Sequence, residues 1–517
     1  MSILTPSILD SDQLHRDALT VLQPGFEGTE PPEWVRRHLA AGLGSVALFG
    51  RNVTDQAQLA ELTRALREQN PDVLIAIDEE GGDVTRLEVG SGSSWPGNLA
   101  LGAIDDPVLT RDVARELGRA LAECGITFNW APAADVNSNP GNPIIGVRSF
   151  GADPELCARH TAAWVEGLQS AGVAACAKHF PGHGDTAVDS HHGLPLIDVD
   201  EELLRSRDLP PFRAAVAAGA KAMMSAHIMI PALDPVYPAT LSPAVLGRLL
   251  RGPASEGGLG YDGLIVTDAI EMGAIADTYG IAEGTVLALA AGADAICVGG
   301  GLCDEETVLQ LRDAIVEGVR SGRLPAERLA QAAQRVRELG SWARQRAQGA
   351  PTEPDLSIGL RAARRALRVT ADPAQPFVPV TDRPYVASFS AESNIAVGDE
   401  TPWGLAGMLA ERFPGTRSRN FGPEQAASGQ LDALMAEVLA EADGRRLVLV
   451  VRDLHRHEWM SAALRLLLTA RPDALVVEMG VPQAEPVGAL HIATHGAARV
   501  CALAAVEVLT GQPSVSV

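Results

Sequence analysis

Short apolar runs alternate with helix-like segments along the first part of the chain. Eight runs of mostly apolar residues lie at 19–25, 45–50, 73–78, 126–132, 173–180, 220–228, 264–269 and 295–300. Most are apolar at successive positions, which is typical of strands buried on both faces of a parallel sheet. Helix-like segments separate several of them, at 55–70, 107–125, 157–172 and 284–293. This alternation predicts a (β/α)8 TIM-like barrel, with a doubly wound sheet as the alternative because periodicity alone does not close a barrel.

Polar residues sit at the carboxyl ends of several of these apolar runs. Their positions are Asp78, Glu79, Glu80, Asn129, Lys178, His179, His227 and Asp268. In a parallel barrel the carboxyl ends of all strands meet on one face, where the βα loops build the active site. The regularity therefore favours the barrel and predicts a functional site at that face.

The remaining chain has the pattern of a smaller α/β unit. Amphipathic helices are expected at 326–347 and 355–369, before a proline-rich segment at 371–384. Apolar runs then recur at 385–391, 445–453, 474–480 and 491–496, together with a helix that carries Trp403 and a final helix. We expect a catalytic barrel at 1–350, a helical and proline-rich linker at 351–384, and a C-terminal α/β sandwich-like domain at 385–517.

Length and composition restrict the class of protein. A chain of 517 residues is too long for one ordinary domain core. An apolar fraction of 46% and a charged fraction of 21% are typical of globular proteins, and no apolar stretch is long enough to span a bilayer. With 42 basic and 65 acidic residues, the formal net charge of −23 disfavours a nucleic acid or an anionic membrane as partner.

The first residues and the cysteines bear on the compartment. A secretory signal needs a basic region, then a long apolar core, then a cleavage site of small residues, and the start of the sequence lacks this succession. We therefore expect no secretory signal and a cytoplasmic location. The six cysteines are scattered without a CxxC pair. This favours free thiols in a reducing compartment over a disulfide framework.

The segment 176–195, CAKHFPGHGDTAVDSHHGLP, concentrates histidine and aspartate. His183, Asp185, His191 and His192 are residue types that bind metals, but they lie in a Gly/Pro-rich loop without the short helical spacing of HExxH. A phosphate cradle would need a complete glycine-rich loop ending in GK[ST], which GHGDT lacks. We therefore disfavour a metal site and a phosphate cradle here.

Charged residues from several strand ends would meet in one polar pocket at the top of the barrel. The set comprises Asp78, Arg86, Arg148, Lys178, His179 and Asp268. Such a set suits a ligand rich in hydroxyl groups, because charge-assisted hydrogen bonds to hydroxyls fix its orientation. A small-molecule carbohydrate is the expected partner.

Four blocks of the sequence resemble the signature blocks of glycoside hydrolase family 3. They are AIDEEGGDVTRL (76–87), GVRSFG (146–151), KHFPGHGDTAVDSHHGLP (178–195) and IVTDAIEMGAI (265–275). They follow the order of the family and are most similar to its β-N-acetylglucosaminidase branch, which acts on peptidoglycan fragments. The resemblance implies a (β/α)8 barrel, a retaining double-displacement mechanism and no metal or organic cofactor. No motif anchors the C-terminal domain to the family.

The resemblance assigns the reacting groups. Asp268 matches the family's nucleophile, and the alternative is an aspartate that caps the next helix. His191 matches the general acid/base of the branch, with Asp189 as the carboxylate that orients it and raises its basicity. The alternatives are that both are solvated loop residues, or that His192 takes the role of His191.

The same comparison assigns the sugar-binding residues. Asp78, Arg86, Arg148, Lys178 and His179 match the positions around the non-reducing sugar. From the residues alone, the two arginines could instead pair with Asp83 or Glu79. We expect His183 to hold the loop and Met272 to serve in packing.

These observations predict a cofactor-free exo-β-N-acetylglucosaminidase acting on small fragments such as muropeptides during peptidoglycan recycling. A phosphorylase is an alternative, because an uncharged or cationic acid/base would not repel phosphate as the acceptor. A β-glucosidase and a non-catalytic sugar-binding protein are further alternatives. The sequence leaves open the aglycone, the oligomeric state and the role of the C-terminal domain.

Overall fold

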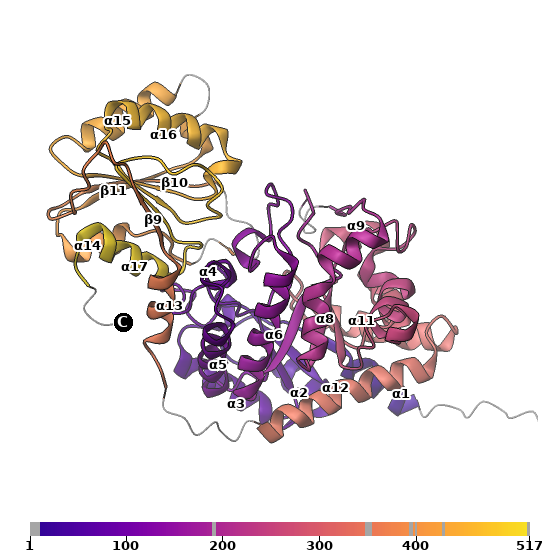
Figure 1. Cartoon of the computed structure of the whole chain (residues 1–517). Coiled ribbons are helices and arrows are strands. Elements are labelled where there is room, and N and C mark those ends of the chain that lie inside the picture. Colours follow the sequence, from indigo (N-terminus) through magenta and orange to yellow (C-terminus); the bar gives the residue numbers. More distant parts are fainter. Residues whose placement is uncertain are drawn as a thin grey trace, which may run out of the picture.

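The computed structural model of the chain describes residues 11–188, 193–346, 354–391, 397–398, 401–426 and 430–513. Figure 1 shows a larger α/β part, coloured from indigo to salmon, and a smaller α/β part in orange and yellow beside its upper edge. Among the described helices, none combines the length and the apolar composition needed to cross a membrane.

Eight parallel strands form the interior of the larger part. They are β1 (Leu22–Pro24), β2 (Ser45–Leu48), β3 (Leu74–Ile77), β4 (Phe128–Asn129), β5 (Ala174–Phe180), β6 (Ala222–Ser225), β7 (Leu264–Thr267) and β8 (Ile296–Val298). Strands β2 to β7 pair in chain order, and β1 pairs with β8. The ring closes where the Thr267 N–H donates to the Ala295 carbonyl at 3.0 Å and Ser45 Oγ donates to the Leu22 carbonyl at 3.2 Å. The predicted barrel is confirmed, and each apolar run contains one strand.

Helices surround this ring. They are α1 (Ser11–Thr20), α2 (Glu33–Ala41), α3 (Gln56–Arg67), α4 (Asn98–Ile104), α5 (Pro107–Glu123), α6 (Pro154–Ser170), α7 (Glu201–Leu203), α8 (Pro210–Ala217), α9 (Gly273–Tyr279), α10 (Ile281–Ala291), α11 (Glu305–Arg320) and α12 (Ala326–Arg346). Helices α5 and α6 start alike: Asp106 and Asp153 accept from the backbone N–H three residues on, at 3.1 and 2.6 Å, and proline occupies the first helical position. Both features are favourable helix starts.

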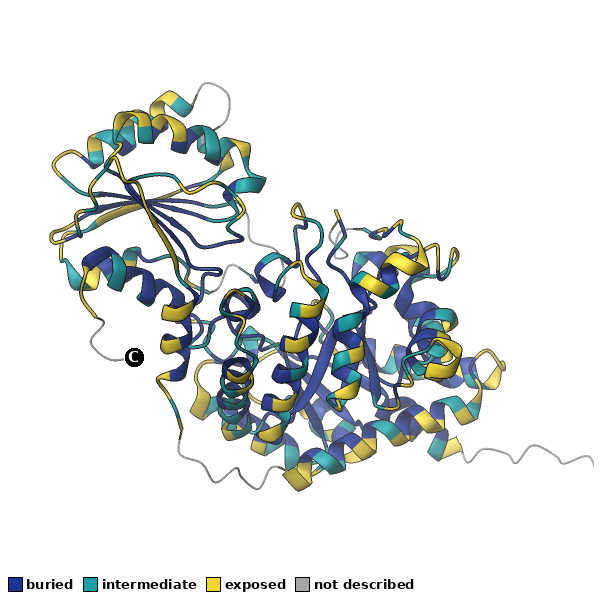
Figure 2. Cartoon of the chain, viewed as in Figure 1, coloured by how far each residue is buried: buried dark blue, intermediate teal, exposed yellow. Residues whose placement is uncertain are grey.

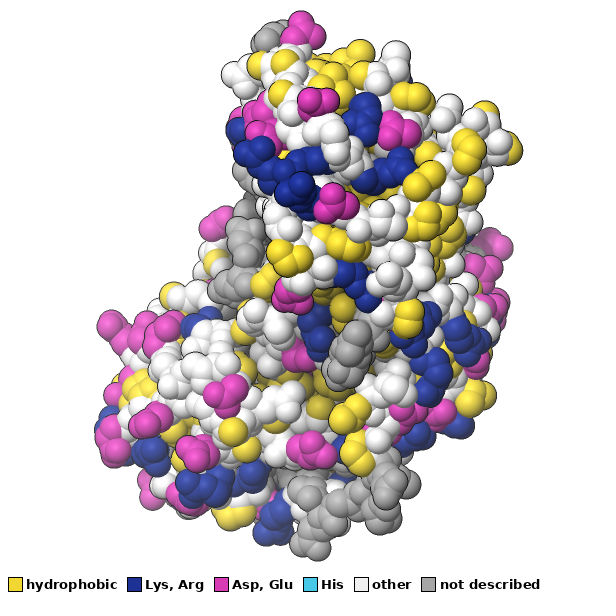
Figure 3. All heavy atoms as spheres, turned by 90° about the vertical axis from the view of Figure 1, so that its left-hand side faces the viewer, with side chains coloured by type: hydrophobic (Ala, Val, Ile, Leu, Met, Phe, Trp, Pro, Cys, Tyr) yellow, Lys and Arg dark blue, Asp and Glu magenta, His cyan; other side chains and the backbone are white. Residues whose placement is uncertain are grey.

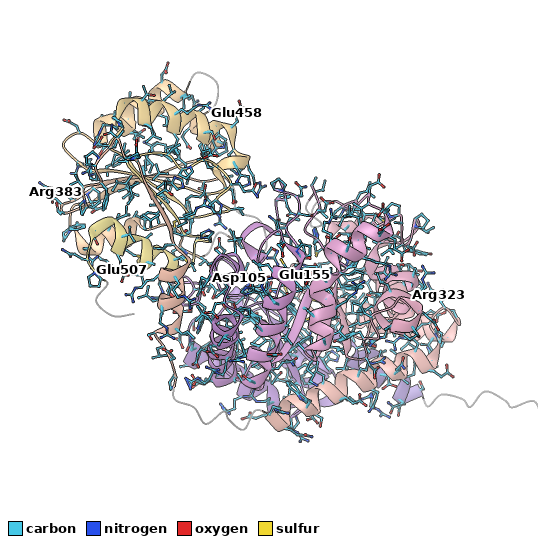
Figure 4. The ribbon with its side chains drawn as sticks, viewed as in Figure 1. Asp105, Glu155, Arg323, Arg383, Glu458 and Glu507 are labelled. Atoms are coloured by element: carbon cyan, nitrogen blue, oxygen red, sulfur yellow. The ribbon has the colours of Figure 1, made fainter. Side chains whose placement is uncertain are left out.

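Segments of 3-10 and π-helix occupy parts of the connections. They are η1 (Gly50–Asn52), η2 (Gly146–Arg148), η3 (Leu204–Asp208), η4 (Ala239–Leu241), η5 (Pro243–Arg251), η6 (Ala254–Glu256), η7 (Pro423–Ala426) and η8 (Leu454–Arg456). Of these, η3 and η5 are the π-helices. On the outer surface, Asp105 after α4 forms an ion pair with Arg159 of α6 at 2.7 Å, and Figure 4 labels Asp105 near the junction of the two parts.

The smaller part is a six-stranded sheet between two layers of helices. Its strands are β9 (Arg368–Ala371), β10 (Tyr385–Phe389), β11 (Arg417–Phe421), β12 (Leu447–Val451), β13 (Leu475–Glu478) and β14 (Leu490–Ala493), in the order β11-β10-β12-β13-β14-β9. Only β9 runs antiparallel to its neighbour. In Figure 1, α15 (Leu431–Glu441) and α16 (Glu458–Ala470) cover one face of the sheet, and α14 (Ala406–Arg412) and α17 (Arg499–Thr510) cover the other.

Two details of this part differ from the sequence analysis. Residues Arg368–Ala371, which we assigned to the linker, form the edge strand β9 after α13 (Ile358–Ala366). The helix expected to carry Trp403 starts only at Ala406, because Pro402 and Gly404, with a φ of 88°, interrupt helical backbone before it.

The strands of both sheets are buried, and the outer faces of the helices are exposed (Figure 2). Strands β9 and β11 are exceptions, since all four residues of β9 and four of the five residues of β11 are exposed. Figure 3 shows that Lys and Arg side chains gather on one side of the smaller part. The charges of Arg417 and Arg419 on β11 suit an edge strand, because charged side chains discourage pairing with another chain. All six cysteines carry free thiols.

Candidate active site

A cavity of about 610 Å³ opens at the carboxyl ends of the barrel strands. The six residues predicted to form a polar pocket all line it: Asp78, Arg86, Arg148, Lys178, His179 and Asp268. They come from the ends of β3, β5 and β7 and from the loops after β3 and β4. The structure therefore brings these six residues together.

A buried ion network forms one wall of the cavity. Lys178 Nζ contacts Asp78 Oδ1 and lies 2.7 Å from Glu80 Oε1. Arg148 donates to both oxygens of Glu80, from Nη2 at 2.7 Å and from Nε at 3.0 Å. Glu80 and its two cationic partners are almost completely buried, whereas 19% of the Asp78 side chain is exposed. Asp78 is thus the member most open to a ligand.

The charges of this network support one another. Burial by itself would raise the pKa of Glu80, but the neighbouring Arg148 and Lys178 outweigh burial and hold that pKa well below its usual range. Burial by itself would lower the pKa of Lys178, whereas Asp78 and Glu80 raise it above its usual value. The pKa of Arg148 is likewise raised, chiefly by Glu80, against the effect of burial. Glu80, Arg148 and Lys178 therefore stay charged at neutral pH.

Arg86 lies on the loop after β3. Its Nη2 is 4.0 Å from Asp78 Oδ2, and its backbone N–H donates to Glu79 Oε2 at 2.7 Å. Burial raises the pKa of Glu79 to about 7, although N–H groups of Leu87 and Arg86 oppose this. Asp83 forms its ion pair with Arg452 of the smaller part. The alternative pairing of the two arginines with Asp83 or Glu79 is therefore wrong for Arg148, which binds Glu80.

Asp135 orients His179, and the sequence analysis missed it. Its Oδ2 lies 2.8 Å from His179 Nδ1, and its Oδ1 accepts the backbone N–H groups of His179 at 3.1 Å and His183 at 2.7 Å. Asp135 is fully buried; burial would raise its pKa, but the two histidines lower it below the usual value. The ring is thus held with Nε2 at 3.4 Å from Arg148 Nη2.

His183 holds the loop that follows β5. Its Nδ1 lies 2.7 Å from Thr186 Oγ1, and its carbonyl accepts from Asn142 Nδ2 at 2.9 Å. Burial lowers the pKa of its ring to about 4. Within the part of the chain that the structure describes, no three His, Cys, Asp or Glu side chains are grouped to hold a metal ion.

Asp268 follows β7 and faces the cavity. Its Oδ1 accepts the N–H of Ala269 at 2.8 Å, and its own N–H donates to the Ser225 carbonyl at 3.1 Å. The next helix, α9, starts at Gly273 with Met272 as its capping residue, so Asp268 does not cap it. Met272 is buried and also lines the cavity. Asp189, His191 and His192 lie outside the described residues.

Glu271 is a second carboxylate that the sequence analysis did not predict, and it lines the cavity on the side of β7 and β8. Its Oε1 accepts N–H groups from Gly299, Gly300 and Gly301, at 2.8, 2.5 and 3.3 Å. These glycines follow β8, the last strand of the barrel. Glu271 thereby joins the loops after β7 and β8, next to Asp268.

Comparison with known proteins identifies relatives of the barrel. Residues 26–339 match the family model described as the glycosyl hydrolase family 3 N terminal domain. Beta-hexosaminidase A of Pseudoalteromonas piscicida is 36% identical over 353 residues, which cover 63% of this chain and 56% of that protein. The chain thus spans little more than half the length of this relative.

Solved structures extend the similarity to both parts of the chain. A glycoside hydrolase family 3 beta-N-acetylglucosaminidase from Paenibacillus sp. str. FPU-7 superposes with a TM-score of 0.85 at 34% identity, over 97% of each chain. The beta-glucoside phosphorylase BglX bound to 2FGlc has a TM-score of 0.74 at 19% identity, over 98% of this chain and 93% of that one, and shows the fold alone. Since the family model covers more than half of the sequence, the chain belongs to glycosyl hydrolase family 3.

Proposed function

We propose that this glycoside hydrolase is a retaining exo-β-N-acetylglucosaminidase that releases terminal N-acetylglucosamine from small glycans such as muropeptides. The observation that carries the proposal is that Asp268 and a buried, charged network at the ends of β3 to β5 line the same cavity. The names of the Pseudoalteromonas and Paenibacillus relatives support the preference for an N-acetylated amino sugar. Peptidoglycan recycling and a cytoplasmic location stay predictions.

The proposed reaction has two steps. Asp268 attacks the anomeric carbon and forms a glycosyl ester while the glycosidic C–O bond breaks. The leaving oxygen takes a proton from the general acid, which we assign to His191 with Asp189 as its partner. A water molecule then gives a proton back to His191 and hydrolyses the ester, so the β configuration is retained.

The network would bind the hydroxyl groups of the sugar. Asp78 offers a partly exposed carboxylate, and Lys178 and Arg86 offer charged donors beside it. Because Glu80 and Asp135 fix Arg148 and His179 before the ligand arrives, little ordering of these side chains is needed on binding. Both effects favour a tightly oriented sugar.

A phosphorylase remains the second candidate. The cavity wall carries Arg86, Arg148 and Lys178, which could attract an anionic acceptor, and the fold is shared with a beta-glucoside phosphorylase. In that case inorganic phosphate would take the place of water in the second step. The β-glucosidase alternative differs only in the sugar.

One product assay separates these candidates. We expect release of aryl alcohol from aryl β-N-acetylglucosaminide, with little from aryl β-glucoside, and free N-acetylglucosamine as the product even with phosphate present. Sugar 1-phosphate as the main product would establish the phosphorylase instead, and a preference for the glucoside would establish a glucosidase.

Two variants test the assigned roles. Asp268→Asn should leave binding intact and reduce turnover by roughly 10⁶-fold, as loss of a nucleophile can in other enzymes. His191→Ala should slow aryl substrates with good leaving groups much less than natural disaccharides, because those leaving groups need no proton. Unchanged turnover in the first variant, or equal losses on both substrates in the second, would overturn the respective role.

A further inference from the structure

The C-terminal domain, residues 368–513, covers the two loops that carry Arg86 and Arg148. The first loop, 79–97, follows β3, and the second, 130–153, follows β4. Figure 1 shows α4, which directly follows the first loop, next to the smaller part of the molecule. Gly398 of this smaller part also lines the cavity. The contacts between the domain and these loops define what the domain does for the site.

Asp83 is the main point of attachment on the first loop. Only 2% of its side chain is exposed, and both of its oxygens are bound by the C-terminal domain. Its Oδ2 pairs with Arg452 Nη2, and its Oδ1 accepts the backbone N–H of Ala497 at 2.7 Å. Breaking one partner of such a buried pair is costly, because it leaves a charge without compensation.

The far end of the same loop is attached separately. Arg499 contacts Ser94 Oγ through Nη2 and donates to the Gly92 carbonyl from Nε at 3.3 Å. The backbone N–H of Val500 donates to the Ser93 carbonyl, also at 3.3 Å. The C-terminal domain thus holds the loop near its beginning and near its end.

The backbone on either side of Asp83 is too tight to absorb a shift at that residue. Gly81 and Gly82 have φ values of 72° and 65°, and a Cβ on Gly82 would lie 2.5 Å from the Cα of Gly97. Three residues after Asp83, the backbone N–H of Arg86 is fixed to Glu79 Oε2. Because only two residues separate Asp83 from Arg86, a displacement of Asp83 would strain this hydrogen bond and shift Arg86, whose guanidinium lies 4.0 Å from Asp78 in the cavity.

The turn that presents Arg452 is itself rigid. Glu478 accepts the N–H groups of Asp453 at 2.9 Å and Leu454 at 3.1 Å, directly after Arg452. Asp453 has a left-handed φ of 57°, and its Oδ1 accepts the N–H of Val481 at 2.8 Å. Nearby, His455 Nε2 donates to the Pro140 carbonyl of the second loop at 2.9 Å.

We propose that Asp83 and Arg452 are positioning residues through which the C-terminal domain holds Arg86 in its sugar-binding place. The domain is then a working part of the active site, although none of the proposed reacting groups belongs to it. This inference rests on the proposed function only in assigning sugar binding to Arg86.

The kinetic test uses Arg452→Ala with two companions. We expect its KM to rise about tenfold while kcat changes less than about twofold, because a misplaced binding group weakens substrate and transition state alike. Arg452→Lys should recover most of the loss, since an ammonium group can still pair with Asp83. The matched control is Arg446→Ala: Arg446 precedes β12, Arg452 follows it, and their side chains are 20% and 17% exposed. Arg446 pairs with Asp473 inside the domain, so its loss should not raise KM.

Hydrogen exchange gives a readout that does not depend on activity. In Arg452→Ala the amides of Arg86 and Leu87 should exchange faster than in the wild type, whereas the amides of β5 should exchange at the wild-type rate. In Arg446→Ala all amides of the loop 79–97 should exchange at the wild-type rate. Asp83→Asn should reproduce the effect and replaces Arg452→Ala if that variant does not fold. The inference would be overturned if KM and amide exchange were unchanged in both Arg452→Ala and Asp83→Asn. It would also be overturned if Arg446→Ala changed KM and exchange as much as Arg452→Ala does. If the wild type does not cleave the amino-sugar substrate, the proposed function fails, and exchange at Arg86 alone decides the positioning role.

Discussion

The cavity wall of the barrel and the interior of the C-terminal domain each bury a glutamate, with opposite electrostatic results. Glu80 in the barrel has Arg148 and Lys178 as partners, and its pKa lies well below the usual range despite burial. The Glu478 side chain in the C-terminal domain accepts backbone N–H groups from Asp453, Leu454 and Gly480. Burial, with the charge of Asp453 adding to it, raises the pKa of Glu478 to about 8.

Glu79 shows that the difference comes from the partners and not from the domain. It is the direct neighbour of Glu80 and is fully buried in the same barrel. Its bonds from Thr85 and from the N–H groups of Arg86 and Leu87 resemble those of Glu478, and burial raises its pKa to about 7. Neutral donors thus compensate burial only in part, whereas two cations overcompensate it.

The two kinds of buried carboxylate suit different tasks. A permanently charged network can hold cations ready for a hydroxyl-rich ligand at any pH near neutrality. A carboxylate bound by backbone N–H groups fixes a turn, as Glu478 does for the residues that follow Arg452 and Glu79 does for the loop of Arg86. Under the proposed function the charged cluster serves binding, whereas Glu478 and Glu79 hold the shape of nearby loops.

The largest effect is expected from Glu80→Gln. The change leaves the buried charges of Arg148 and Lys178 with less compensation, which should lower the free energy of unfolding by about 3–5 kcal/mol. It should also raise KM, because both cations face the cavity. Denaturant unfolding and steady-state kinetics measure the two effects.

Asp294→Asn is the control for this experiment. Asp294 is fully buried with Arg251 and Arg328 as ion-pair partners, but it precedes β8 and so lies at the opposite end of the barrel. Side chains at that end of a barrel lie away from the active-site face and serve stability rather than chemistry. We expect a comparable loss of stability without a rise in KM. A similar rise in KM for both variants would show that the network near Glu80 acts only through stability.

A smaller effect with a distinct pH dependence is expected from Glu478→Gln. The folded pKa of Glu478, about 8, lies above its ordinary value, so the folded wild type binds one more proton than the unfolded chain between these two values. This contribution makes the wild type lose stability as pH rises through that window, by at most about 1.4 kcal/mol per pH unit. Glu478→Gln has no ionisable group at this position, so its stability lacks this dependence on pH.

The stability difference between Glu478→Gln and the wild type should therefore change in favour of the variant from pH 5 to pH 8. The substitution also alters the hydrogen bond that the Leu454 N–H donates to residue 478. Any resulting loss of unfolding free energy is constant with pH and only separates the curves of the variant and the wild type by a fixed amount. Parallel curves of unfolding free energy against pH would contradict the raised pKa of Glu478.

The fold of the barrel was predictable because its strands are buried on both faces and read as apolar runs. Strand β11 was not, since RSRNF contains one apolar residue and its exposed edge position demands no more. The linker assignment at 368–371 failed for a similar reason: all four residues of β9 are exposed. Edge strands are held by backbone hydrogen bonds, which leave little trace in the side chains.

Much of the site could also be predicted, because its residues stand at strand ends or in the family's blocks. Asp135 could not, since it follows β4 by several residues and an aspartate in AADVN resembles any turn residue. The pair of Asp83 and Arg452 joins positions 369 residues apart, and only the arrangement of the two domains brings them together. Local patterns thus find the groups that line the cavity better than the groups that hold them in place.

The smallest effect is expected from an ion pair of similar geometry at the surface. Asp105 pairs with Arg159 at 2.7 Å, but their side chains are 46% and 41% exposed. The hydrogen bond from Arg159 is the main reason that the pKa of Asp105 falls to about 2, so any stability from the pair is present near neutral pH and is lost only as pH falls through that value. Because water screens the pair, Arg159→Ala should change the free energy of unfolding by less than about 1 kcal/mol, and less still at high salt. Denaturant unfolding at low and high ionic strength tests this, and a loss as large as that of Glu80→Gln would show that ion-pair geometry, and not burial, sets the cost.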